Sequence, residues 1–258
     1  MGDNSAKIKG IFRYPVKGLT PQPVARIELS AGQTIPFDRM YAIENGPSGF
    51  DPAHPKYSPK FKFLELMRNA RLAELRTAFD FANHTLTIRH ENREATHGDL
   101  RTAEGRANIE RFFAEFCADE LRGPPKVLQG QGHSFSDVAK KVVSIINLAS
   151  VAALEDVTGA PVHPLRFRAN LHVEGWPAWH EFGLLNKEVA IGPSARAKVV
   201  KRIVRCAATE VDPDTGIRDL PIPDTIMKAY GHMDCGVYAE VIAGGEIVQG
   251  DRIETPGD

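Results

Sequence analysis

The chain has 258 residues, of which 42% are hydrophobic and 25% charged, proportions typical of a globular protein with a sizeable core. Its formal net charge of -1 excludes a general attraction to nucleic acid or to an anionic membrane, and no basic cluster is interleaved with aromatic residues. The three cysteines are too few for a disulfide framework, the N-terminus is polar and no apolar run approaches the ~20 residues of a membrane span. We therefore expect a cytoplasmic protein with neither a nucleic-acid nor a membrane partner.

Short strands separated by turns of proline and glycine are expected in the first half of the sequence. The expected strands cover residues 8–14, 24–29 and 37–43, and strand-like alternation resumes over 70–90. Residues 45–59 hold four prolines and predict a long surface loop, a kind of segment that often serves binding. The clearest helix covers 103–119, where apolar residues fall on one stripe at Ile109, Phe112, Phe113 and Phe116.

The second half of the sequence is again mostly strands, with two short helices. The expected strands cover residues 142–146, 166–173, 186–192, 198–204, 236–243 and 246–253, and the expected helices cover 148–157 and 224–230. Many short strands with few helices predict a mainly β fold with α decorations, an α+β protein built on a barrel. A weak boundary near 95–105 or 124–135 favours two domains, which we place at residues 1–100 and 101–258.

One cysteine is distinguished by its position. Cys206 follows the apolar run 199–204 and precedes a turn rich in Asp, Pro and Gly, so we expect a strand to deliver its thiol to a rim. The cations of Lys201, Arg202 and Arg205 are close in sequence, and such neighbours favour the thiolate that binds soft metals or attacks electrophiles. The residues alone also allow a small buried side chain, which is the usual fate of a free cysteine.

Five segments carry a family resemblance. They are Tyr14-Pro15-Val16-Lys17-Gly18, Asp38-Arg39, Phe167-Arg168-Ala169-Asn170-Leu171, the run from Cys206 to Gly216, and the closing strands from Gly236 to Asp251. In this order they resemble the MOSC family, the molybdenum-cofactor-sulfurase C-terminal domain, together with the β-barrel domain that precedes it in many relatives. The resemblance spans residues 11 to 253 and is to the amidoxime-reducing-component branch, which has both domains.

The resemblance implies a fold, a cofactor and a set of site residues. The fold is a MOSC-type β-barrel with a smaller N-terminal β-barrel-like domain. Relatives bind molybdopterin-ligated molybdenum, the molybdenum cofactor (Moco), and reduce N-hydroxylated compounds. By motif, Cys206 is the metal ligand and the catalytic residue. The cofactor-binding residues implied by motif are Lys17, Arg39, Arg168 and Asn170.

Other positions join the site as weaker expectations. Gly18 replaces the family's serine, and its backbone N–H is expected to meet the cofactor phosphate instead. The stretch after Ser136 departs from the family's Ser-Asp-Thr-Ser segment, so we expect Lys140 or Lys141 to take over phosphate contacts if this loop lines the pocket. Turn chemistry is favoured over cofactor binding for Asp212. Tyr238 is either a barrel residue or a pocket residue.

Three functions remain open on the sequence. The first is a molybdenum-dependent oxidoreductase that transfers an oxygen atom from a small-molecule substrate. Because no cysteine cluster precedes Asp258, this function implies a separate electron-donor protein, a flavin or iron–sulfur reductase. The second is a sulfur carrier with a persulfide on Cys206, and the third is a non-catalytic cofactor-binding module. No hydrolase elbow, phosphate-binding loop or dinucleotide fingerprint occurs.

Overall fold

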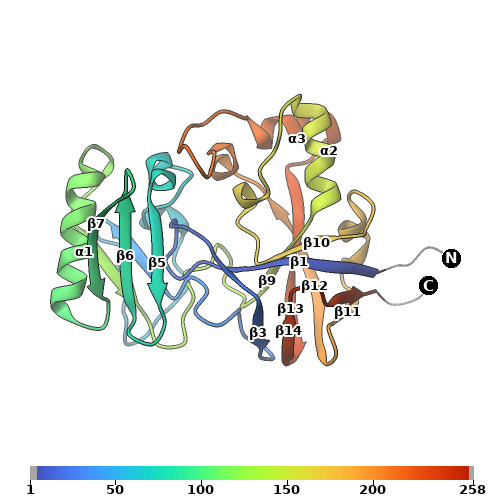
Figure 1. The fold of residues 1–258 in the computed structure, drawn as a ribbon, viewed down its shortest axis with the longest axis horizontal. Coiled ribbons are helices and arrows are strands. Elements are labelled where there is room, and N and C mark those ends of the chain that lie inside the picture. The colour runs from blue at the N-terminus through green and yellow to red at the C-terminus, as the bar shows by residue number, and fades with distance from the viewer. Residues whose placement is uncertain (1–4, 256–258) are drawn as a thin grey trace.

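The second half of the chain, together with the first strand, forms a closed barrel of seven strands (Figure 1). The structure, a computed structural model, describes residues 5–255. The barrel strands are β1 (Ser5–Arg13), β9 (Val143–Asn147), β10 (Leu171–Glu174), β11 (Glu188–Ile191), β12 (Ala195–Val204), β13 (Asp234–Ala243) and β15 (Arg252–Glu254). They join in the order β10-β9-β13-β12-β11-β15-β1, and β1 also pairs with β10, which closes the ring. All these pairs are antiparallel except β9 with β10.

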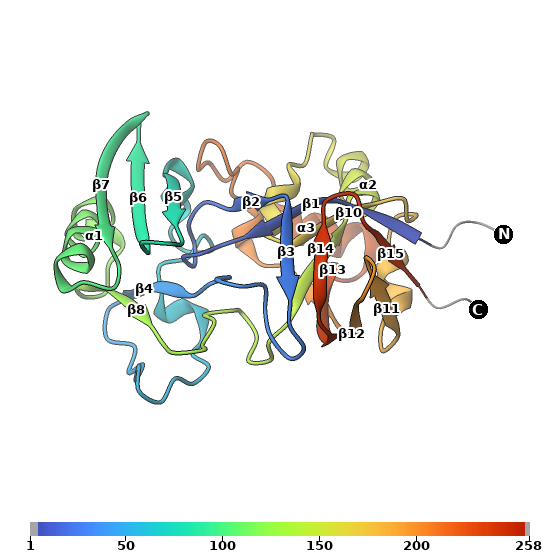
Figure 2. The same cartoon turned by 60° about the horizontal axis from the view of Figure 1, so that its bottom comes forward.

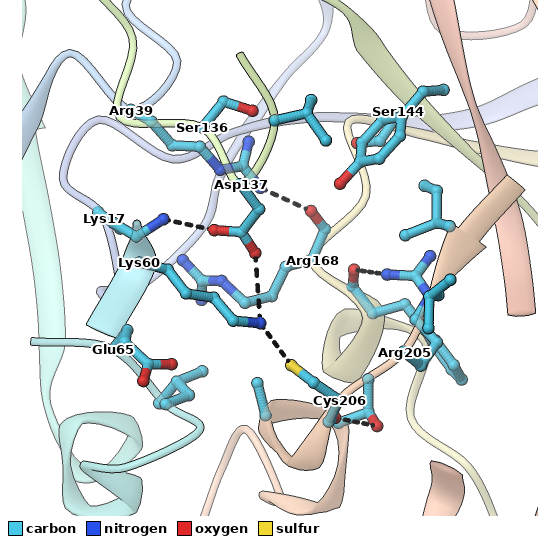
Figure 3. A pocket seen from close by; sticks show the side chains of 18 of the residues that line it. Lys17, Arg39, Lys60, Glu65, Ser136, Asp137, Ser144, Arg168, Arg205 and Cys206 are labelled. Atoms are coloured by element: carbon cyan, nitrogen blue, oxygen red, sulfur yellow. Dashed lines mark hydrogen bonds and ion pairs between the residues drawn. The ribbon is translucent and has the colours of Figure 1, made fainter. Parts of the chain in front are cut away.

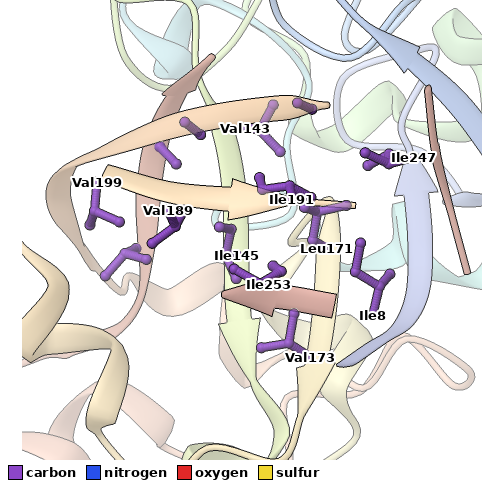
Figure 4. Close-up of a cluster of buried hydrophobic side chains, with 14 of the residues drawn as sticks. Ile8, Val143, Ile145, Leu171, Val173, Val189, Ile191, Val199, Ile247 and Ile253 are labelled. Carbon is purple, nitrogen blue, oxygen red and sulfur yellow. The ribbon is translucent and has the colours of Figure 1, made fainter. Parts of the chain in front are cut away.

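The barrel interior is filled by aliphatic side chains that each strand contributes (Figure 4). Ile8 on β1, Ile145 on β9 and Ile253 on β15 are each at most 1% exposed. In the first half of β12 buried and exposed residues alternate, as expected for a strand with one face on the core and one on solvent. Burial of this apolar surface is the main force that holds the ring together.

The first half of the chain builds a smaller β unit beside the barrel. Its strands are β4 (Tyr41–Asn45), which pairs with β8 (Pro125–Gln129), and the three-stranded sheet β5 (Arg76–Asp80), β6 (Thr85–His90) and β7 (Arg93–Asp99). Helix α1 (Ala103–Phe116) packs on β7 and β8, and Ile109 and Phe113 of its apolar stripe are fully buried. The N-cap Thr102 accepts a hydrogen bond from the N–H of Gly105, which fixes where the helix begins.

Two further helices and one β ribbon flank the barrel (Figure 2). Helices α2 (Leu148–Thr158) and α3 (Ile222–Tyr230) pack on each other over a separate apolar cluster that includes Phe167 and Cys235. Strand β3 (Arg26–Leu29) pairs with β14 (Gly245–Val248), and β2 (Gln22–Val24) extends the barrel sheet from β1. Through Phe167 and Cys235, the two helices pack against the turn before Arg168 and against the start of β13.

The predicted fold class is confirmed, and the helices expected over 103–119, 148–157 and 224–230 are present with small shifts of their ends. The expected division at residue 100 stays a prediction. The apolar side chains of α1, just after that residue, share one cluster with those of β5 and β6, just before it. Within residues 5–255, no helix has the length and apolar character needed to span a membrane.

Four strand predictions were wrong in part. Residues 37–40 form a turn, residues 70–74 and 164–167 form 3-10 helices, and the strand expected over 246–253 is two strands, β14 and β15, that pair with different partners. The sequence prediction also missed β7 and β8. The apolar residues in each of these segments favoured a strand in the sequence prediction. In the turn at 37–40, however, the buried side chain of Asp38 accepts the Tyr14 N–H at 2.9 Å and bends the chain.

Candidate active site

A cavity of about 340 Å³ lies between the smaller β unit and the barrel (Figure 3). The first half of the chain contributes residues 17–18, 38–39 and 57–66 to its wall, and the barrel side contributes 136–144, 166–170 and 201–209, each in part. This volume lies at the lower end of the range for small-molecule sites. Segments far apart in the sequence therefore form a single site.

The thiol of Cys206 faces this cavity next to a lysine (Figure 3). Cys206 follows β12 by two residues and precedes a 3-10 turn, Ala207–Glu210, whose Thr209 N–H donates to the Cys206 carbonyl at 3.0 Å. The ammonium of Lys60 donates a hydrogen bond to the Cys206 sulfur at 3.0 Å. Burial opposes the charge of Lys60, but Cys206 and Asp137 outweigh it and raise the pKa of Lys60. A thiolate at this place therefore has a fixed positive partner.

Lys17 and Arg39 lie together on the opposite wall. Lys17 is 5% exposed and donates to the carbonyl of Phe135 at 2.9 Å and to Asp137 at 2.5 Å. Burial lowers the pKa of Lys17, although Asp137 opposes that shift. Arg39 forms an ion pair with Asp38, which raises the pKa of the guanidinium against the effect of burial. Both cations predicted from the N-terminal motifs therefore reach the cavity.

Arg168 and Asn170 also line the cavity, but they do not share a strand. Arg168 has a left-handed backbone with φ of 50° and stacks on the ring of Tyr14 at 4.3 Å. Burial lowers the pKa of Arg168 to about 10. Asn170 is 2% exposed; its amide oxygen accepts a hydrogen bond from the Ser144 hydroxyl at 2.8 Å, and its amide nitrogen donates to the carbonyl of Phe12 at 3.1 Å. Asn170, which directly precedes β10, therefore ties β1 to β9, and its amide is engaged within the protein.

Arg205 supports the wall behind Cys206. Its guanidinium is 8% exposed and donates to the carbonyls of Cys235 at 2.7 Å and Phe167 at 2.8 Å. No carboxylate among residues 5–255 forms an ion pair with it, and burial lowers its pKa. Arg205 thus braces the strand end that carries Cys206 against β13, and it adds an uncompensated positive charge to the site.

Two carboxyl groups remain in the cavity wall beside Asp38. Asp137 faces the open cavity and is 47% exposed. Although burial acts in the opposite direction, the charges of Lys17 and Lys60 hold the pKa of Asp137 well below its usual range. Glu65 is 5% exposed, and burial raises its pKa. One oxygen of Glu65 accepts the N–H of Met67 at 2.8 Å.

Positive charge dominates the cavity as a whole. Eight lining residues are cationic, namely Lys17, Arg39, Lys60, Arg166, Arg168, Lys201, Arg202 and Arg205, whereas three are acidic, namely Asp38, Glu65 and Asp137. Several of these cations have carboxylate partners, but Arg168 and Arg205 form no ion pair with a carboxylate within residues 5–255. A cation in such a setting is costly unless an anion neutralises it. The site is therefore suited to an anionic ligand.

Two family models match the chain in sequence. The MOSC N-terminal beta barrel domain matches residues 5–120, and the MOSC domain matches residues 129–254. The chain is a MOSC domain protein with a MOSC N-terminal beta barrel. No curated protein matches it in a sequence search.

Two solved structures resemble this MOSC protein. The YuaD protein of Bacillus subtilis is 15% identical with a TM-score of 0.46, over 96% of this chain and 94% of that one. YiiM from Geobacillus stearothermophilus is 19% identical with a TM-score of 0.34, over 45% of this chain and 54% of that one.

Several residues proposed from the sequence lie outside the cavity of this MOSC protein. Lys140 pairs with Glu240 at 2.5 Å and Lys141 donates to Gln33 at 2.6 Å, so the structure directs neither ammonium into the site. Asp212 accepts hydrogen bonds from its own turn and pairs with Arg166 at 3.0 Å, in agreement with the turn role favoured for it. Lys140, Lys141 and Asp212 are close in sequence to residues of the site, but these contacts direct their side chains to other partners.

The remaining predicted residues line the cavity in different ways. Gly18 lines it with a left-handed backbone, φ 83°, and Tyr238 lines it from β13. Arg202 stacks over the Phe182 ring at 4.3 Å, and no hydrogen bond joins it to Cys206 among the described residues. From the sequence we expect Lys201, Arg202 and Arg205 to lie near the thiol, but the cation that bonds to it is Lys60.

Sequence reasoning missed Lys60, Glu65 and the role of Asp137. Lys60 directly follows the proline-rich loop, whose Tyr57 and Pro59 also line the cavity. The length of that loop was the one available signal, because long loops in compact domains are commonly functional. Asp137 lay in the segment that resembles the family's Ser-Asp-Thr-Ser, yet the neighbouring lysines drew the prediction away from it.

Proposed function

We propose that this MOSC protein binds the molybdenum cofactor, with Cys206 as the metal ligand from the protein, and reduces N-hydroxylated small molecules. The observation that carries the proposal is the cavity itself. It holds one thiol, 3.0 Å from a lysine ammonium, within a wall on which cations outnumber carboxylates. A soft thiolate suits molybdenum, and the cations suit the phosphate of a pterin cofactor.

The residues present fit such a cofactor and do not fit a bare metal ion. No group of three or more His, Cys, Asp or Glu within residues 5–255 is arranged to hold a metal. A metal on Cys206 therefore needs further ligands from an organic carrier. Lys17, Arg39 and Arg168 would hold the anionic end of that carrier, and Gly18 would offer its N–H at close approach.

When bound, the cofactor supplies two-electron chemistry and accepts an oxygen atom. In the overall reaction an N–OH group takes up two electrons and two protons, the N–O bond breaks, and an N–H compound and water leave. The electrons come from a separate donor protein, of the flavin or iron–sulfur class. Lys60 orients the thiol of Cys206, and Arg205 holds the backbone that presents it. The protein thus positions both reactants beside one thiol.

The metal content of the protein tests the proposal. The full chain is expressed in a host that makes the molybdenum cofactor, and molybdenum is measured per chain by elemental analysis. We expect near-stoichiometric metal in the wild type and in Cys117→Ala, since Cys117 lies in the core of the smaller β unit, and a strong loss in Cys206→Ala. Wild-type protein without molybdenum from that host would refute the proposal.

A second measurement separates catalysis from cofactor storage. Molybdenum-loaded protein is supplied with a chemical one-electron donor and benzamidoxime, and the amidine product is measured by chromatography. Turnover that depends on Cys206 supports the oxidoreductase. Loaded protein without turnover would support the non-catalytic binding module.

The same Lys60–Cys206 pair supports a sulfur carrier as the second candidate. A persulfide anion on Cys206 would need a cationic neighbour just as a thiolate does. Intact-mass analysis distinguishes this function. A species about 32 Da heavier, absent from Cys206→Ser and found in protein without molybdenum, would favour sulfur transfer.

A further inference from the structure

The carboxylate of Asp137 stands where the cations of the cavity converge (Figure 3). One of its oxygens lies 2.5 Å from the ammonium of Lys17, and the other lies 4.0 Å from that of Lys60. Arg39 also acts on it electrostatically and, with both lysines, holds its pKa well below the usual range. Asp137 is therefore an anion surrounded by the cations that a ligand phosphate would need.

The segment that carries Asp137 is held mainly at its base. Between β8 and β9 it forms no strand or helix. At its start, the Phe135 N–H donates to the Arg39 carbonyl at 2.8 Å in a buried setting. Around Asp137 itself the ties are polar: buried Lys17 donates to its carboxylate at 2.5 Å, the Tyr57 hydroxyl donates to the Asp137 carbonyl at 3.3 Å, and Lys140 pairs with Glu240. The last two contacts are exposed and contribute little stability, so the ion pair with Lys17 is the main tie at Asp137.

We propose that Asp137 is an internal counterion that fills the oxyanion subsite until the oxyanion of the ligand displaces it. The inference rests on the proposed function only in requiring an anionic ligand. Two anions cannot both occupy the place between Lys17 and Lys60, because their repulsion at such short range would be large. A phosphate or pyrophosphate carries more charge and more acceptor oxygens than one carboxylate, so it replaces Asp137 and the segment turns outward.

Competition from Asp137 lowers the affinity of the wild-type protein for the ligand. The apparent dissociation constant of a ligand rises as the fraction of binding-competent protein falls. The ion pair between Asp137 and Lys17 keeps most molecules in the arrangement in which Asp137 fills the oxyanion subsite. Asp137→Asn removes the competing charge and leaves the size of the side chain almost unchanged. The substitution is therefore expected to tighten oxyanion binding, whereas loss of a ligand-binding residue would weaken it.

Titration of inorganic pyrophosphate into the full-length, cofactor-free chain tests the inference by calorimetry. We expect Asp137→Asn to bind at least about tenfold more tightly than the wild type. Asp214→Asn, an equivalent change at an exposed turn, serves as the matched control and is expected to bind like the wild type. Equal or weaker binding by Asp137→Asn, or no binding by either protein, would overturn the inference.

Hydrogen exchange of the wild type provides a measurement that needs no variant. Saturating pyrophosphate is expected to speed amide exchange over residues 136–141 while it slows exchange around Lys17. Slower exchange over 136–141 would show that the ligand closes the segment, which contradicts displacement. Because both measurements use protein without cofactor, they are independent of the molybdenum content. A chain that never takes up molybdenum can still show the Asp137 effect, and a loaded chain can lack it.

Discussion

Substitution of Arg205 should change the stability of the protein by an amount that can be calculated, because the Arg205 guanidinium joins two segments on either side of Cys206. Arg205→Met keeps much of the side-chain volume but removes the hydrogen bonds to the carbonyls of Cys235 and Phe167, at 2.7 and 2.8 Å. Hydrogen bonds from a charged donor contribute about 1.5–3 kcal/mol each. Relief of a buried charge that has no carboxylate partner offsets part of this loss. We therefore expect the free energy of unfolding to fall by about 2–4 kcal/mol.

Urea unfolding of the cofactor-free chain measures this change. Arg202→Met is the matched control, because Arg202 lies three residues earlier and makes a stacking contact with Phe182 instead of buried hydrogen bonds. The control is expected to cost less than about 1 kcal/mol. If Arg205→Met lowered the unfolding free energy by no more than Arg202→Met, the buried hydrogen bonds would not be what holds the Cys206 segment.

Three further predictions concern single residues. Burial lowers the pKa of His172 to about 4, so the folded state resists protonation of this side chain. The stability that this group contributes is present above its ordinary pKa of ~6.5 and is lost as the pH falls below that value. The free energy of unfolding in urea should therefore be about 2 kcal/mol lower at about pH 5 than at about pH 7.5, and His172→Phe should remove this difference. Gly18→Ala should cost about 1–3 kcal/mol, because φ is 83° and the new Cβ would lie 2.9 Å from a backbone oxygen, and Gly32→Ala, with open space, should cost less. Lys60→Met should slow iodoacetamide labelling of Cys206 several-fold in mass spectrometry, since the hydrogen-bond donor to sulfur is lost; an unchanged rate would contradict the role given to this pair.

The regular elements were predictable where the local pattern and the tertiary packing agree. The stripe of α1 places Ile109 and Phe113 in the core, as the 3.6-residue period requires. The 3-10 helix Pro164–Phe167 was not predictable in this way. The left-handed backbone of Arg168 that follows it is held by a hydrogen bond from Arg39 to its carbonyl at 3.0 Å and by the ring of Tyr14. Both partners lie more than a hundred residues away in the sequence.

The candidate site was predictable only in its motif residues. Lys17, Arg39, Arg168 and Cys206 meet in one cavity, as the resemblance implied. Lys60 was invisible because 146 residues separate it from Cys206, and its own neighbours show no pattern. Cations beside the cysteine in sequence were a poor guide, because the side chains of successive residues point in different directions and only the fold decides which of them meets the thiol.

The pairing of β1 with both β10 and β15 has a consequence for how the molecule is made. The ring closes only when a strand synthesised near the start meets strands synthesised more than 150 residues later. Until then, β10 and β15 present unpaired edges that invite pairing with other chains. A fragment of residues 129–254, the span matched by the MOSC model, lacks β1 and should aggregate. We therefore expect the span matched by the MOSC model to need β1 from outside that span for a closed barrel.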